Sequence, residues 1–263
     1  MDKEFLKKCL EQGMSTRDIE KICDKKRSTI AYWINKYNLI DNSHYQKHDN
    51  YKFEKIDTKE KAYILGFILA DSAITKTNTE ISIAMTDKNI VEFIAKIIDG
   101  NVHYDNSFDK KTRRFPRARL IKKIVDITKF TGGYAKPDRH YPRVRDDLER
   151  YLIQGLFDSD GCLTWGRRKD KDRLWQKISF TSHLKILEGV QKYLINKLGI
   201  STVIRPKTNA NCFVLEFSNL NDVIKFCEHI YPNEDFIILK RKYLKYEALR
   251  LELEENGEGA KQQ

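Results

Sequence analysis

The sequence lacks a long hydrophobic run, a cysteine cluster and a secretory leader. Its longest apolar stretch, Ala62–Ala70, falls far short of the roughly 18–20 residues that a membrane-spanning helix needs. The N-terminus is charged from its first residues and has no apolar signal core. The five cysteines contain no CxxC pair, so neither a disulfide framework nor a zinc site is indicated: Cys9, Cys23, Cys162, Cys212 and Cys227. We therefore expect an intracellular protein without a membrane partner.

Acidic residues are in the minority. The chain of 263 residues has 49 Lys and Arg against 38 Asp and Glu, a formal charge of +11. Such a surplus attracts polyanions, and together with the aromatic content it favours nucleic acid as the partner. The length allows one large domain or two to three small ones.

The first forty residues show three short helical patterns, over Lys3–Gly13, Ser15–Asp24 and Ser28–Leu39. Ser15 and Ser28 are good N-cap residues. Two helices joined by a tight turn form a helix-turn-helix, which favours DNA binding over an ordinary three-helix bundle. The residues expected to face a major groove lie on or just before the third helix: Lys26, Arg27, Ser28, Thr29, Tyr32 and Lys36.

From Lys59 onward the chain repeats itself. Two apolar stretches end in acids, "AYILGFILADSAI" from Ala62 and "YLIQGLFDSDGCL" from Tyr151, and their equivalent acids are 160 − 71 = 89 residues apart. Each is followed by a strand pattern, Glu80–Thr86 and Trp175–Thr181. Each repeat then continues with a helix, two strands and another helix, the last over Lys122–Phe130 and Leu220–Tyr231. A long helical pattern over Asp235–Glu255 follows.

We interpret this duplication as two αββαββα units of an α+β fold, related by a pseudo-two-fold axis. The expected boundaries are 1–40 for the helix-turn-helix domain, 41–57 for a linker, 58–145 for the first repeat, 146–250 for the second repeat and 251–263 for a flexible tail.

Small residues mark one face of each motif helix. Gly66 and Ala70 are four apart in the first, and Gly155 and Ser159 are four apart in the second, so each pair shares a helix face. Small residues let two helix backbones approach closely. If the two faces meet, the acids that follow them, Asp71 and Asp160, become neighbours.

Two carboxylates at helix C-termini oppose the helix dipoles by roughly 0.3–1 kcal/mol each, and they repel one another. Because the same unfavourable choice occurs twice, it indicates a functional site. A hard divalent cation would relieve the repulsion, since Mg²⁺ and Ca²⁺ prefer carboxylate oxygens. Beside a phosphodiester, such an ion activates water and stabilises the leaving oxygen. A simpler interpretation of the second motif is a C-cap with Gly161 in the left-handed conformation.

The stretches "ILGFILADS" (Ile64–Ser72) and "IQGLFDSDG" (Ile153–Gly161) resemble the two motifs of LAGLIDADG homing endonucleases. The resemblance covers roughly Lys59 to Arg250. It implies a monomer that makes double-strand breaks in long, asymmetric DNA sites with Mg²⁺, or with Mn²⁺ or Ca²⁺ in the same place. It also implies a saddle whose antiparallel sheets lie along the major groove of double-stranded DNA, which admits a β-ribbon.

The family's metal-binding acid falls on Asp71 and Asp160, which the resemblance makes both catalytic and metal-binding. Lys88 matches the lysine that many members place after a strand, near the scissile phosphate. In the second repeat that position falls on Ser182 or His183, so one pocket lacks its usual lysine. The final glycine of the first motif is replaced by Ser72, which tolerates a left-handed turn less well.

The sheets are expected to contact DNA through cations and amides, since arginine suits guanine and asparagine suits adenine. The candidates are Arg113, Arg114, Arg117 and Arg119 in the first repeat, and Arg167, Arg168, Arg173, Lys177, Arg205, Lys207, Asn209 and Asn211 in the second.

The sequence therefore predicts a site-specific double-strand DNA endonuclease with an added helix-turn-helix. A non-cleaving DNA-binding regulator and an RNA maturase on the same scaffold remain alternatives. The presence of both acids favours the nuclease over the regulator.

Overall fold

A computed structural model describes most of the chain. The described residues are 1–11, 14, 16–37, 39, 55–76, 80–105, 117–123, 127–168, 173–208, 211–232 and 236–255, with only the backbone described at 11, 35, 105 and 117–123. The chain divides into two compact units, Met1–Lys52 (the N-terminal unit) and Phe53–Gln263 (the C-terminal unit).

The N-terminal unit contains three helices, α1 (Lys3–Glu11), α2 (Thr16–Ile22) and α3 (Arg27–Lys36). Helix α3 begins one residue before the predicted N-cap Ser28, and Ser15 lies outside the described residues. The helices enclose a small apolar core: Leu6, Cys9, Leu10, Ile19, Ile30 and Ile34. Half-buried Trp33 and Tyr37 border this core.

The first repeat forms an antiparallel sheet with helices. Its elements are α5 (Lys59–Asp71), β1 (Ser72–Ile74), β2 (Glu80–Met85), α6 (Lys88–Ile98), β3 (Asn101–Asp105), β4 (Arg117–Lys123) and α7 (Thr128–Thr131). The strand order is β1-β2-β4-β3. The predicted helix over Lys122–Phe130 was wrong in part, because Lys122 and Lys123 pair with β2 as strand residues. Sheet pairing overrides the local helical pattern there.

The second repeat has the same layout. Its elements are α8 (Asp146–Asp160), β5 (Gly161–Arg168), β6 (Arg173–Ser182), α9 (Leu184–Leu198), β7 (Val203–Pro206), β8 (Phe213–Phe217) and α10 (Leu220–Ile230). The strand order is β5-β6-β8-β7, equivalent to that of the first sheet. The predicted duplicated α+β fold is therefore confirmed. The αββαββα pattern includes a strand directly after each motif helix, but the sequence analysis gave it no residue range; β1 and β5 are these strands.

Helix α11 (Lys240–Glu255) follows the second repeat. It begins five residues later than the helical pattern from Asp235 predicts. It also includes residues 251–255, which we had expected in the tail, because Leu253 is buried against the core. Residues 256–263 lie outside the described residues.

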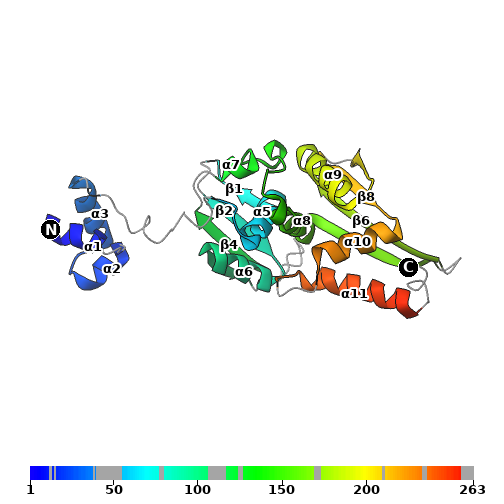
Figure 1. Cartoon of the computed structure of the whole chain (residues 1–263). Coiled ribbons are helices and arrows are strands. Elements are labelled where there is room, and N and C mark those ends of the chain that lie inside the picture. The colour runs from blue at the N-terminus through cyan, green and yellow to red at the C-terminus, as the bar shows by residue number, and fades with distance from the viewer. Residues whose placement is uncertain are drawn as a thin grey trace. The chain divides into compact units, whose positions relative to one another are not determined.

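The two motif helices pack against each other at the centre of the C-terminal unit. Figure 1 shows α5 and α8 side by side, with β2 and β4 on one side and β6 and β8 on the other. Their backbones touch where the glycines meet. A Cβ added to Gly155 would lie 2.0 Å from the carbonyl oxygen of Tyr63, and one added to Gly66 would lie 2.5 Å from that of Leu152. The predicted meeting of the two small-residue faces is confirmed.

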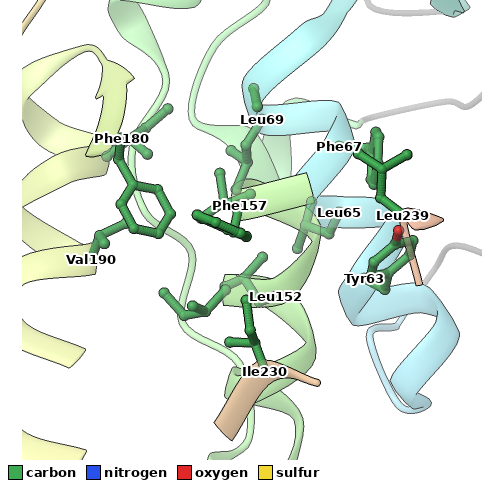
Figure 2. Close-up of a cluster of buried hydrophobic side chains, with 14 of the residues drawn as sticks. Tyr63, Leu65, Phe67, Leu69, Leu152, Phe157, Phe180, Val190, Ile230 and Leu239 are labelled. Atoms are coloured by element: carbon green, nitrogen blue, oxygen red, sulfur yellow. The ribbon is translucent and has the colours of Figure 1, made fainter. Parts of the chain in front are cut away.

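The hydrophobic core of the C-terminal unit surrounds this helix pair. Every residue of α5 from Ala62 to Ala70 is buried, so the helix has no polar face along that stretch. Phe157 points from α8 into the core, where its ring centroid lies 5.5 Å from that of Phe180 on β6 (Figure 2). Both sheets thus pack their inner faces against one shared core. Within the part of the chain that is described, no helix is long and apolar enough to span a membrane.

We predict that Gly155→Ala destabilises the protein by about 2–4 kcal/mol, because the new methyl group meets a backbone carbonyl that cannot move alone. Gly166→Ala is the control. Its added methyl would lie 3.3 Å from the nearest atom of the Trp175 side chain, and no backbone atom is among its nearest neighbours. Urea unfolding of both variants measures the difference. Equal losses for the two would contradict the backbone contact.

Candidate active site and nucleic-acid interface

The motif helices end in acids and pass directly into strands. Helix α5 ends at Asp71 and α8 ends at Asp160. The next residues, Ser72 (φ −92°) and Gly161 (φ −75°), are both extended, so the alternative interpretation of Gly161 as a left-handed C-cap is wrong. Glycine is needed at 161 for another reason: an added Cβ would lie 2.2 Å from the ring of Phe157.

The close helix contact brings the two terminal acids together. Burial raises the pKa of Asp160, and the negative charge of Asp71 raises it further. Asp71 reaches the surface, with 46% of its side chain exposed. The expected neighbourhood of these two carboxylates is thus present at the shared end of α5 and α8.

Two lysines that the sequence analysis did not single out lie near this pair. The Nζ of Lys136, in a short 3₁₀ helix over Lys136–Asp138, lies 3.6 Å from Oδ1 of Asp71. The charges of Lys136 and Lys242 lower the pKa of Asp160 and so partly oppose the effects of burial and of Asp71. The acid pair therefore has both negative and positive charges as neighbours.

A buried cation closes the C-terminus of each motif helix. Arg139 is 1% exposed, and its guanidinium donates to the carbonyl oxygens of Ile68 (2.7 Å) and Ser72 (3.0 Å). The ammonium group of Lys242 donates to the carbonyl oxygens of Phe157 and Gly161.

These two sets of carbonyls are equivalent, because 157 − 68 and 161 − 72 both equal the repeat offset of 89. A cation at a helix C-terminus offsets the dipole that the acids oppose. Arg139 lies before α8 and Lys242 lies in α11, so the two cations are not at equivalent positions of the sequence repeat. Only the structure shows that they bind equivalent carbonyls.

The two acids of "DSD" in the second motif have different surroundings. Asp158 is fully buried and accepts hydrogen bonds from the hydroxyls of Tyr63 (2.8 Å) and Tyr231 and from the backbone N–H of Leu239 (3.3 Å). Burial raises its pKa to about 6, although these hydrogen bonds act in the opposite direction. Its equivalent in the first repeat is Leu69. Asp158 therefore connects α5, the end of α10 and the segment before α11. Of the two acids, only Asp160 lies near Asp71 of α5.

The lysine position of the family pattern differs between the repeats. Lys88 is the first residue of α6, and its Nζ lies 5.7 Å from the ring centroid of Tyr104 on β3. The adjacent Asp87 accepts a hydrogen bond from Arg241 of α11 at 3.0 Å, which links the first repeat to the last helix. At the corresponding place in the second repeat, Ser182 ends β6 and His183 is the N-cap of α9.

Strand register separates the cations of the second sheet into two groups. Ile178 and Phe180 of β6 face the buried core, so Lys177 lies on the opposite, open face. Register then assigns the same open face to four of the predicted DNA-binding residues: Arg168, Arg173, Lys177 and Arg205. Lys177 forms an ion pair with Glu216 on this face, with 2.7 Å between Nζ and Oε1.

Arg167 lies on the inner side of the same sheet. Its Nε donates to Glu252 of α11, so this arginine joins the sheet to the last helix. The neighbouring Trp165 also faces α11 and donates from Nε1 to the carbonyl oxygen of Lys245 at 2.9 Å. A single position along the strand thus separates Arg167 from the open-face Arg168.

The remaining predicted contacts are only partly described. Arg117 and Arg119 belong to β4, where Arg119 pairs with Ala84 of β2 and Arg117 pairs with Asp105 of β3. Lys207 and Asn211 are exposed between β7 and β8. Arg113, Arg114 and Asn209 lie outside the described residues.

The predicted contact residues of the N-terminal unit gather on α3. Tyr32 is 57% exposed, and the Nζ of Lys36 lies 5.7 Å from its ring centroid. Lys26 and Ser28 are exposed, while Thr29 is half-buried. Arg27 is exposed but pairs with Glu20 of α2, with 3.1 Å between Nε and Oε2.

Comparison with known proteins finds a family match within the second repeat. Residues 147–231 match the family model described as "LAGLIDADG-like domain". The resemblance predicted from the motifs is thereby confirmed on the second repeat, and the equivalent first sheet extends the same architecture across the C-terminal unit.

Solved structures share the fold. A structure described as meganuclease I-SmaMI bound to uncleaveable DNA with a TTGT central four is 11% identical, with a TM-score of 0.52, over 78% of this chain and 92% of that chain. The I-SmaMI LAGLIDADG homing endonuclease bound to cleaved DNA is 13% identical, with a TM-score of 0.51, over 74% of this chain and 90% of that chain.

A curated relative is the "Ribonucleoside-diphosphate reductase NrdEB subunit alpha" of Bacillus subtilis (strain 168). It is 23% identical over an alignment of length 173, and the match covers 58% of this chain and 15% of the relative. Because the match spans so little of the relative's length, its reductase name carries no argument about this chain.

We predict that Asp158→Leu destabilises the protein by at least about 3 kcal/mol, because three buried donors lose their acceptor. Asp158→Asn keeps one acceptor oxygen in the same place, so its loss should be smaller. Thermal unfolding of both variants tests this. Leucine is the residue at the equivalent position 69 of the first repeat. If Asp158→Leu is as stable as the parent, the hydrogen bonds of Asp158 do not stabilise the fold.

Proposed function

We propose that the chain is a site-specific endonuclease that cleaves both strands of double-stranded DNA. The observation that supports this most is the pair of carboxylates, Asp71 and Asp160, at the shared end of two contacting helices. The helices belong to repeats with the same strand order. A pseudo-two-fold pair of acids suits a duplex, in which two antiparallel strands present two scissile phosphates.

The acid pair fits a divalent metal. Asp71 is half-exposed, and both residues offer hard oxygen donors, which Mg²⁺, Mn²⁺ and Ca²⁺ accept. Among the described residues there is no cluster of three or more potential side-chain ligands. This still suits Mg²⁺, which is commonly held by one or two carboxylates with waters and substrate phosphates. When bound, the ion would activate water and stabilise the leaving oxygen.

The protein's own cations have separate roles in this proposal. Lys136 and Lys242 hold positive charge beside the acids, where the negative charge of a phosphate group would lie. Arg139 and Lys242 bind the helix-end carbonyls and so fix the backbone from which the acids project. Lys88 keeps its proposed catalytic role in the first repeat. The absence of its counterpart in the second repeat predicts unequal cleavage rates for the two strands.

DNA contact is assigned to the open sheet faces and to the N-terminal unit. The open face of the second sheet carries the four cations defined above, and such residues supply phosphate contacts and some base contacts. In the N-terminal unit, α3 is the proposed recognition helix of a helix-turn-helix. Joining two DNA-binding units by one chain raises the local concentration of each at the site. Regulation without cleavage and RNA maturation are the outcomes that would replace this proposal.

We predict that Asp71→Asn and Asp160→Asn each reduce double-strand cleavage by at least about 100-fold while DNA affinity changes little, because each removes a charged ligand but no sheet contact. The substrate is DNA spanning the gene's insertion site with the insertion removed, assayed in Mg²⁺ and in EDTA. Asp146→Asn is the matched control, since it makes the same change at the opposite end of α8. Full cleavage by either site variant would overturn the assignment of that acid.

We predict that removing residues 1–40 weakens DNA binding without moving the cut position, since the acids belong to a separate compact unit. Gel-shift titration measures the affinity, and sequencing of the cut ends measures the position. A displaced cut would show that the N-terminal unit sets the register of cleavage.

A further inference from the structure

A large apolar side chain is exposed among the cations of the β5–β6 hairpin in the second sheet. Trp175 of β6 is 42% exposed. It pairs with Gly166 of β5 and shares strand parity with Lys177, so it lies on the open face. Trp165, in contrast, faces α11 on the inner side, as shown by its bond to Lys245. The two tryptophans of this hairpin therefore point to opposite sides of the sheet.

The indole of Trp175 rests against the neighbouring strand. A Cβ added to Gly166 would lie 3.3 Å from Nε1 and 3.5 Å from Cε2 and Cζ2 of that indole. Because Gly166 has no side chain, the indole packs directly against the backbone of β5 at this position. The ring is held near the surface by the strand pair, and much of its apolar area remains available to a partner.

The surrounding charges indicate what kind of partner this is. Arg168 and Arg173 are directly opposite each other in the β5–β6 register, and like charges in that relation destabilise a sheet. Lys177, which is paired with Glu216, lies on the other side of Trp175. A polyanion would relieve this repulsion. The ligand that suits the site is therefore polyanionic and also presents an apolar group to the indole.

We propose that Trp175 recognises the 5-methyl group of a thymine in the major groove of duplex DNA. This inference rests on the proposed function and adds a base preference to it. The thymine methyl is the apolar group that the major groove displays, and a β-ribbon fits that groove. The indole has one polar hydrogen, on the Nε1 that lies by Gly166, so its exposed carbons are suited to apolar contact.

The test uses the full-length protein in EDTA. Because EDTA removes the divalent ion that the proposed cleavage needs, binding is measured without cleavage. A duplex recovered by binding selection from a randomised library serves as the probe. Deoxyuridine then replaces each thymidine in turn, which removes one methyl group and keeps the Watson–Crick edge. We expect the parent protein to bind about fourfold more weakly at one position in the half-site of the second repeat, the contribution of one buried methyl group.

The variants identify the side chain responsible. Trp175→Ala should bind the unmodified duplex more weakly and show no deoxyuridine effect at that position. Trp175→Leu, which keeps apolar area, should retain part of the effect. Trp165→Phe is the matched control on the inner side of the same hairpin, and it should keep the parent's profile.

The possible failures are distinguishable. Tight duplex binding with the same deoxyuridine profile in the parent and in Trp175→Ala would overturn this inference and leave the proposed function in place. A variant whose other two tryptophans are phenylalanine reports the fluorescence of Trp175 alone. If that fluorescence shows stronger binding to single-stranded than to duplex DNA, base stacking would replace methyl recognition as the role of Trp175. Failure to recover any bound duplex would overturn both proposals.

Discussion

The backbone contact between Gly66 and Gly155 is the constraint on which the rest of the structure depends. It brings two buried helices closer than any side chain would allow, because a methyl group at either glycine would overlap a carbonyl of the other helix. With the helices in this position, the two sheets share one core and two terminal acids become neighbours. Helix packing and the candidate chemistry therefore have the same origin.

That arrangement requires opposing charges to be balanced. Two acids lie where the dipoles of α5 and α8 are least favourable to them, and Arg139 and Lys242 bind the carbonyls of the same helix ends. Both cations are buried, and burial lowers the pKa of Lys242 to about 8. The charge next to the acids is thus supplied from within the fold.

The two repeats differ where the chemistry is expected. Asp158 has tyrosine hydroxyls as partners in the second motif, whereas the first motif has Leu69 in that place. Arg139 serves one helix end and Lys242 the other, and only the first repeat keeps a lysine at the start of its next helix. The two repeats therefore share a scaffold but place different side chains around their equivalent acids.

The sequence by itself determined the motif helices and their duplication, because apolar periodicity and four-residue spacing are local properties. The close contact of the two helices, and with it the approach of Asp71 to Asp160, belongs to the tertiary structure. The tertiary structure decided which cations bind the carbonyls at the two helix ends. Arg139 binds Ile68, which is 71 residues away in the sequence, and Lys242 binds Phe157, which is 85 residues away. The tertiary structure also decided that Arg167 faces α11 while Arg168 faces outward. Composition cannot make that distinction, because neighbouring strand residues alternate and only the register assigns each to a face.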